Sequence, residues 1–168
     1  GKLGGAVATV GKAFGMRVVA WSQNLTDERA AEIGAERVSK DELLAQSDYI
    51  SIHLVLSDRS RGLIGAEDLA LMKPTAYLVN TSRGDVVDER ALTELLAKRH
   101  IAGAGLDVYA QEPQIPDKLR ALSNVVLLPH IGSATIEGRL QMGDKVIINV
   151  QTFWDGHTPP DRVIEAML

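Results

Sequence analysis

The 168-residue sequence contains no cysteine, which excludes disulfides, thiolate metal sites and a cysteine nucleophile and fits a reducing compartment such as the cytoplasm. It also lacks an excess of basic charge, because 18 Lys and Arg stand against 22 Asp and Glu for a net charge of -4. We therefore expect neither a nucleic-acid partner nor an electrostatic membrane anchor. No apolar run is long enough to span a bilayer, and no signal-peptide pattern opens the chain.

The composition that remains is that of a globular protein with one core. Apolar residues make up 45% of the chain and charged residues 24%, and the length suits one domain better than two. The sequence enters a helical pattern at Gly1, with Leu3, Val7 and Val10 on one face. A domain that opens on a helix without a preceding strand predicts a fragment whose first strand is missing.

Strand and helix patterns alternate along the rest of the chain. Strands are predicted within residues 16–21, 49–54, 76–80, 103–107 and 124–129. Helices are predicted to begin after Thr26, the capping box of Ser39 and Glu42, Asp88 and Thr135. A short helix is expected at 69–72 and an extended exit segment at 158–168. Near-continuous apolar strands that alternate with helices are typical of an α/β fold with a doubly wound parallel sheet, covered on both faces.

Polar residues follow the predicted strands at their carboxyl ends. They are Ser22, His53, Arg83, Asp107 and His130. Because ligands of open parallel sheets bind beyond the carboxyl ends of the strands, these five positions predict a single crevice.

Three of the residues near this crevice have side chains suited to acid–base chemistry on a carboxylate substrate. Arg83, in N-T-S-R-G-D, can grip a carboxylate with two parallel hydrogen bonds; the alternative is a structural salt bridge to Asp85 or Asp88. His130, in L-L-P-H-I-G-S, can exchange a proton, and Glu112 can orient it. The alternative for His130 is a structural histidine satisfied by backbone groups. No pair of histidines has ligand spacing, so we expect no metal.

The first four residues, Gly1-Lys2-Leu3-Gly4, fit the second half of a G-x-G-x-x-G turn that places a helix N-terminus against a pyrophosphate. Plain helix packing is the alternative. A phosphate-binding P-loop at residues 5–12 is excluded by its spacing and by Ala13, where magnesium binding needs Ser or Thr. Ser22 stands where dinucleotide-binding folds place an acidic residue on the ribose, and a turn serine is its alternative.

Taken together, these motifs resemble the coenzyme-binding domain of the D-isomer-specific 2-hydroxyacid dehydrogenase family over nearly the whole chain. The matching stretches are the G-x-x-G start, K-A-F-G-M-R-V, M-K-P-T-A-Y-L-V-N-T-S-R-G, A-G-A-G-L-D-V-Y-A-Q-E-P and L-P-H-I-G-S-A-T. The resemblance implies a Rossmann-type dinucleotide-binding domain over residues 1–168, without the family's second, substrate-binding domain. It also implies a homodimer formed through this domain.

The resemblance further implies a hydride transfer between NAD(P)H and a 2-keto or D-2-hydroxy acid, with Arg83 on the substrate, His130 as acid/base and Glu112 supporting His130. The implied cofactor-binding residues are Gly1, Lys2, Leu3, Gly4, Ser22, Leu54, Val55, Ser60, Thr81, Ser82, Arg83, Asp107, His130, Gly132 and Ser133.

Two residues depart from the family pattern and bear on the cofactor. Ser22 replaces the usual acidic residue, and Val55 stands where proline is common. NAD is the expected cofactor, with NADP as the alternative. A non-catalytic NAD(H)-sensing module of the corepressor type is the rival function, and a phosphite or phosphoglycerate dehydrogenase is a third interpretation that differs only in substrate.

Overall fold

The computed structural model describes residues 1–163, which fall into two compact units. The first unit comprises Gly1–His130 and the second begins at Ile131. Each unit is described by itself below. The single dinucleotide-binding domain expected over residues 1–168 stays a prediction.

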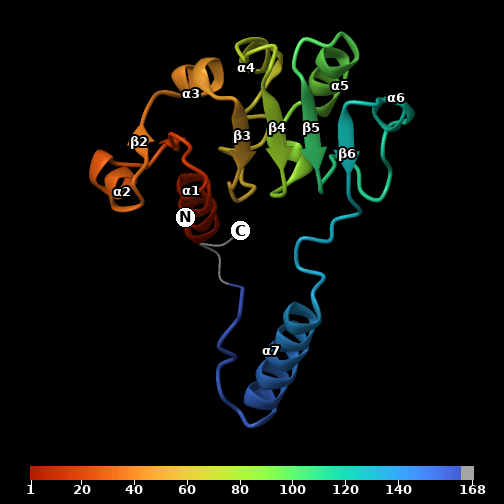
Figure 1. Cartoon of the computed structure of the whole chain (residues 1–168). Coiled ribbons are helices and arrows are strands. Elements are labelled where there is room, and N and C mark those ends of the chain that lie inside the picture. The colour runs from red at the N-terminus through yellow and green to blue at the C-terminus, as the bar shows by residue number, and fades with distance from the viewer. Residues whose placement is uncertain (164–168) are drawn as a thin grey trace. The chain divides into compact units, whose positions relative to one another are not determined.

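The first unit is built on a four-stranded parallel sheet with the strand order β3-β4-β5-β6 (Figure 1). Its strands are β3 (Tyr49–Ile52), β4 (Tyr77–Asn80), β5 (Gly103–Leu106) and β6 (Val125–Leu127). Tyr49 pairs with Tyr77, and Tyr77 pairs with Gly103, so the first three strands start in register. Because all four strands are parallel, their carboxyl ends meet at one edge, as the sequence predicted.

A second sheet of two short parallel strands pairs β1 (Val19–Ala20) with β2 (Glu36–Arg37). Strand β1 lies within the predicted strand at 16–21, whereas β2 was not predicted. Helix α1 (Lys2–Ala13) lies between this pair and β3 (Figure 1). A Cβ atom built on Gly4 would lie 3.5 Å from the Cβ of His53, just beyond β3. A Cβ atom on Gly5 would contact Ile33, which ends helix α2 (Asp27–Glu32), at 3.6 Å.

Four helices cover one face of the larger sheet: α3 (Lys40–Gln46), α4 (Ala66–Ala70), α5 (Glu89–Ala97) and the short α6 (Asp117–Arg120). Each contributes buried leucines to the core, and the sheet contributes alternate strand residues. The largest of these buried apolar side chains are Leu44, Leu69, Leu78, Leu92, Leu96 and Leu119. The predicted helix at 69–72 begins earlier and ends earlier, as α4, and α6 was not predicted.

The helix starts follow from side chains that cap them, which confirms the predicted positions. Ser39 Oγ accepts from Glu42 N–H at 3.1 Å while the Glu42 carboxylate accepts from Ser39 N–H at 2.8 Å. Thr26 accepts from the N–H of Arg29, and Asp88 accepts from the N–H of Ala91. Each such cap satisfies an N–H that the helix cannot, and stabilises it by about 1 kcal/mol.

Within the first unit, strand residues on the opposite face of the larger sheet are exposed. Tyr49 is 62% exposed and Tyr77 44% exposed on this face. Their rings stack on each other, with centroids 5.6 Å apart and an interplanar angle of 13°. The strands therefore alternate between buried and exposed positions, as the burial of Ile50 and Ile52 between exposed neighbours shows.

Apolar side chains are also exposed on α1, where the predicted apolar face does not pack into a core. Leu3 is 75% exposed and Val10 56% exposed. Helical periodicity thus placed these residues on one face correctly, and that face is exposed within the first unit.

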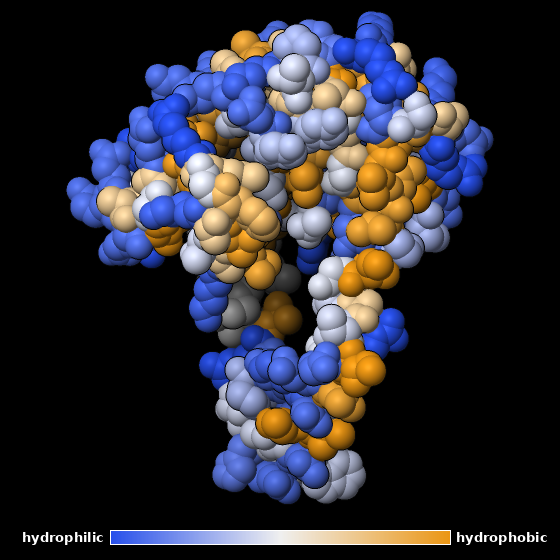
Figure 2. Space-filling model, in the orientation of Figure 1, coloured by the Kyte–Doolittle hydropathy of each residue, from blue (hydrophilic) through white to orange (hydrophobic). Residues whose placement is uncertain are grey.

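The second unit contains α7 (Ile136–Trp154), which is capped by Thr135 and carries no buried residue. Figure 2 shows hydrophobic residues on the surface of this helix, and Trp154 is 86% exposed. Residues 158–163 hold a turn and no strand, and the rest of the predicted exit segment, 164–168, lies outside the described residues. None of the described helices is both long and apolar enough to cross a membrane.

Candidate active site

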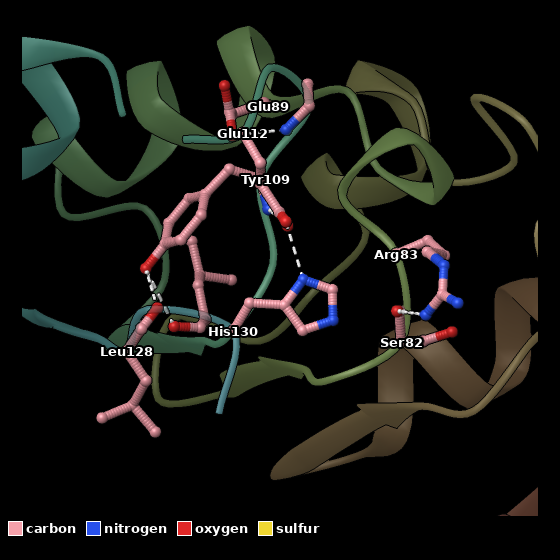
Figure 3. Close-up of polar contacts among 9 residues, drawn as sticks. Ser82, Arg83, Glu89, Tyr109, Glu112, Leu128 and His130 are labelled. Atoms are coloured by element: carbon pink, nitrogen blue, oxygen red, sulfur yellow. Dashed lines mark hydrogen bonds and ion pairs between the residues drawn. The ribbon is translucent and has the colours of Figure 1, made fainter. Parts of the chain in front are cut away.

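The loops that leave β4, β5 and β6 carry the three residues predicted to act on substrate. Arg83 follows β4, Glu112 follows β5 and His130 follows β6 (Figure 3). All three belong to the first unit. The parallel topology brings these loops to one edge of the sheet, although the residues are far apart in sequence.

The Arg83 loop is shaped by the buried residue Asn80 at the end of β4. Its side-chain amide donates to the Arg83 carbonyl at 2.9 Å, and its side-chain oxygen accepts from Ser82 N–H at 3.0 Å. A short 3₁₀ helix, η1 (Gly84–Val86), follows. Asn80 thus closes the turn from inside and leaves the Arg83 side chain exposed at the edge.

Arg83 makes neither of the salt bridges proposed as its structural alternative. Asp85 pairs with Arg61 at 2.5 Å, and Asp88 caps α5. Among residues 1–163, the Arg83 guanidinium donates only to the carbonyl of Ser82, at 2.7 Å. Most of its donors therefore remain available to an anionic ligand.

Glu112 and His130 form the central pair of the site. Glu112 Oε2 lies 2.7 Å from His130 Nδ1, and Glu112 Oε1 accepts from Tyr109 N–H at 3.0 Å (Figure 3). Both carboxylate oxygens are therefore engaged. The contact to Glu112 fixes Nδ1 as the inner nitrogen, so Nε2 is the one that can exchange a proton with a ligand.

The pKa of the Glu112 carboxyl lies below its usual value. Partial burial acts to raise it, but the hydrogen bonds from His130 and Tyr109, together with the positive charges of His130 and Arg83, outweigh burial. The influence of Arg83 on Glu112 means that the two loops are close enough for their charges to interact. Glu112 is consequently a carboxylate at neutral pH and acts as an acceptor only.

His130 has a backbone φ of 55°, in the left-handed region. For a side chain with a Cβ this conformation costs roughly 1 kcal/mol or more. Such backbone strain concentrates at functional positions, where the surrounding structure holds the residue in place.

The start of α1 fits an anionic cofactor group. Gly1 is the N-cap and has no side chain, the first turn has no acidic residue, and a Cβ built on Gly1 would meet nothing within 4 Å. Lys2 and Leu3 are exposed beside it, and Gly4 packs on His53. Open N–H groups at a helix N-terminus with an adjacent cation suit a phosphate.

The predicted cofactor residues after β3 and β4 lie in two loops that are tied together. Ser82 Oγ donates to the carbonyl of Leu54, and Thr81 is exposed beside Ser82. Ser60 is buried, and its hydroxyl donates to the carbonyl of Val55 at 2.7 Å. The Ser60 hydroxyl therefore closes its own loop, while the Val55 side chain is 86% exposed.

The remaining predicted cofactor residues differ in their surroundings. Asp107 is buried at the end of β5, and Ser22 is half-buried after β1. Gly132 and Ser133 are exposed and belong to the second unit. Their roles toward a cofactor stay predictions.

Residues 1–132 match the family model of the D-isomer specific 2-hydroxyacid dehydrogenase, NAD binding domain. The chain belongs to this family. Its family domain is the NAD-binding one, and the observed α/β parallel architecture is the Rossmann-type fold of that domain.

Relatives of known name agree with this membership. The chain is 46% identical over 168 residues to a glyoxylate reductase of Thermococcus litoralis, covering 100% of this chain and 51% of the relative. The crystal structure of a glyoxylate reductase from Paecilomyes thermophila is 42% identical, with a TM-score of 0.78 over 87% of this chain and 44% of that one. The NAD-complexed D-isomer specific 2-hydroxyacid dehydrogenase of Lactobacillus delbrueckii ssp. bulgaricus is 30% identical, with a TM-score of 0.82 over 97% of this chain and 53% of that one.

The chain thus spans about half the length of the relatives it matches. Glyoxylate reductases and 2-hydroxyacid dehydrogenases are NAD(P)-dependent oxidoreductases. The names of the relatives therefore agree with the predicted cofactor class.

Two residues that shape the site of this family member were not predicted from the sequence. Tyr109 bonds both to Glu112 and to the strand that precedes His130, and Glu89 accepts from Ala110 N–H at 3.2 Å (Figure 3). Tyr109 stands inside the D-V-Y-A-Q-E-P stretch that was recognised, but its partner Leu128 is 19 residues away in sequence. A buried tyrosine close to a predicted site residue is the signal that could have indicated it.

Two hollows of the described surface, with volumes of about 250 and 430 Å³, lie beside this site. They are lined by Glu89, Arg90, Thr93, Glu94, Gln111, Gln114, Ile115, Pro116, Asp117 and Lys118. No cluster of metal-ligating side chains occurs among residues 1–163.

Proposed function

We propose that this chain is the coenzyme-binding half of an NAD(P)-dependent oxidoreductase that interconverts a small 2-keto acid and a D-2-hydroxy acid. The observation that carries the proposal is the 2.7 Å contact between Glu112 and His130, with the Arg83 guanidinium on the adjacent loop. A general acid, its carboxylate partner and an anion-binding cation are the groups that reduction of a keto acid needs.

The protein groups divide the work of this reaction. Protonated His130 donates from Nε2 to the forming alkoxide and takes the proton back in the reverse direction. Glu112 stabilises the protonated imidazole and fixes its orientation. Arg83 holds the substrate carboxylate and stabilises charge that develops on the carbonyl oxygen. A bound nicotinamide supplies or accepts the hydride.

The cofactor is held, in this proposal, by the start of α1 and by the loops after the strands. Gly1, Lys2, Leu3 and Gly4 meet the pyrophosphate, and Asp107 faces the nicotinamide carboxamide. NAD is the proposed cofactor, since no arginine directly follows Ser22 to hold a 2′-phosphate; NADP is the alternative. We propose further that the enzyme is a cytoplasmic homodimer.

The test is the oxidation of NADH and NADPH with a panel of 2-keto acids that begins with glyoxylate, because the named relatives include glyoxylate reductases. The assay uses this chain joined to a substrate-binding domain of its family, and the 168-residue chain alone. We expect turnover only in the joined protein, because closure between two domains excludes water and positions the acid.

Replacing His130 with alanine should abolish turnover and leave cofactor binding in place, whereas His157→Ala, at an exposed histidine of the second unit, should leave both unchanged. Turnover that survives His130→Ala would refute the proposed acid. Cofactor binding without turnover of any keto acid would support the NAD(H)-sensing module instead.

A further inference from the structure

Tyr109 is a buried side chain, 5% exposed, whose hydroxyl group lies between two strands. Its Oη donates to the carbonyl of Leu128 at 2.8 Å and lies 3.1 Å from the carbonyl of Leu106 (Figure 3). Leu106 ends β5, and Leu128 directly follows β6. One hydroxyl therefore links the ends of the two strands whose loops carry Glu112 and His130.

The backbone of the same residue reaches the acid–base pair directly. Tyr109 N–H donates to Glu112 Oε1 at 3.0 Å, and Glu112 Oε2 contacts His130 Nδ1 at 2.7 Å. Only Pro129 separates Leu128 from His130 in the chain. These contacts close a ring that runs from the Tyr109 hydroxyl through Leu128 to His130, then through Glu112 back to the Tyr109 N–H.

We propose that Tyr109 is a positioning residue that keeps the Glu112 carboxylate and the His130 imidazole at hydrogen-bond distance. It fixes the carboxylate through its N–H and the backbone before His130 through its hydroxyl. The importance of Tyr109 for catalysis rests on the proposed function. Its role in positioning Glu112 and His130 can be tested without turnover.

Charges around Tyr109 favour the donating form of its hydroxyl. Burial raises the pKa of Tyr109, and the negative charges of Asp107, Glu112 and Glu89 raise it further. The hydroxyl therefore stays protonated at neutral pH and donates to the carbonyl. A phenylalanine at this position would preserve the packing and remove only the hydroxyl's contacts to the carbonyls of Leu128 and Leu106.

The experiment compares the 168-residue chain with its Tyr109→Phe variant by following the Glu112 side-chain carbon resonance through an acid titration. In the parent chain the pKa of Glu112 lies below its ordinary value. We expect Tyr109→Phe to raise it toward its ordinary value, a change that NMR detects. The matched control is Tyr77→Phe, which alters an exposed tyrosine of the sheet and should leave the Glu112 pKa unchanged.

A folded Tyr109→Phe chain with the parent pKa at Glu112 would overturn the inference, and a shift as large in Tyr77→Phe would do the same. In the joined, two-domain protein, Tyr109→Phe should reduce kcat/KM about 3- to 10-fold and displace its pH profile, while cofactor affinity is kept. If the joined protein shows no turnover, the proposed function fails, and the carboxylate titration still decides the role of Tyr109.

Discussion

Gly84 lies against the peptide bond that joins Tyr109 to Ala110, so that a Cβ atom added to Gly84 would fall 2.0 Å from the Tyr109 carbonyl carbon and 2.4 Å from the Ala110 nitrogen. The backbone that follows Arg83 is therefore packed on the backbone that leads to Glu112. This close approach brings the proposed substrate-binding loop and the acid–base loop together, and only glycine permits it.

Replacing Gly84 with alanine should force these two loops apart. We expect a loss of about 1–3 kcal/mol in the free energy of unfolding, measured by urea denaturation, because backbone atoms have to move. The control is Gly105→Ala, where an added Cβ would meet nothing within 4 Å and stability should change little or rise. Equal effects of the two substitutions would contradict the role assigned to the Gly84 contact.

The lowered pKa of Glu112 predicts a specific acid sensitivity. A carboxyl whose pKa is lower in the folded than in the unfolded chain stabilises the fold above the unfolded pKa and loses that contribution as the pH falls through the folded pKa. The ordinary pKa of a glutamate carboxyl, which we take for the unfolded chain, is 4.5. The stability difference between the parent chain and Glu112→Gln, from urea unfolding, should therefore shrink between pH 6 and pH 3. A difference that stays constant over this range would contradict the prediction.

Substitution of Lys2 allows an effect on cofactor binding to be distinguished from an effect on the stability of α1. Lys2→Glu should weaken NADH binding at least about tenfold, because a negative charge would face the pyrophosphate. The same change should stabilise α1 by about 0.3–1 kcal/mol, since acidic groups favour helix N-termini. Lys12→Glu, in the last turn of the same helix, should reduce stability and spare binding. Titration calorimetry and thermal unfolding measure the two effects, and unchanged NADH affinity in Lys2→Glu would remove α1 from the proposed site.

Arg99 provides a test of backbone strain outside the site. It follows α5 with a φ of 54°, and its side chain donates to Ser123 Oγ at 2.8 Å. Arg99→Gly and Arg99→Ala both remove that side chain, but only glycine adopts this φ without strain. The glycine variant should be more stable than the alanine variant by about 0.5–1 kcal/mol in urea unfolding. An alanine variant of equal or greater stability would show that the left-handed backbone carries no such cost.

Helix starts and the main strands could be predicted from the sequence because their signals are local. The capping box of Ser39 and Glu42 joins residues three apart, and the β4 run ends at Asn80 as its apolar pattern indicates. The short strand β2, by contrast, consists of Glu36 and Arg37, both exposed, and carries no strand pattern. The exposure of Tyr49 and Tyr77 depends on their neighbours in space, which periodicity does not record.

The candidate site was predictable to the extent that topology controls it. Glu112 and His130 follow neighbouring parallel strands, and the expected contact between them is present at 2.7 Å. The bond from Tyr109 to Leu128 spans 19 residues and depends on the pairing of β5 with β6, so no local pattern could indicate it. The absence of a salt bridge from Arg83 to Asp85 likewise depends on Arg61, which lies on another loop.

The division of the chain after His130 assigns one tryptophan to each unit. Trp21 lies in the first unit and Trp154 in the second, and the sequence has no other. In a Trp154→Phe variant only Trp21 remains, so the indole emission reports on the first unit. In a Trp21→Phe variant only Trp154 remains, and the emission reports on the second unit. The protein thus contains its own pair of optical probes for following whether the two units melt together or in succession.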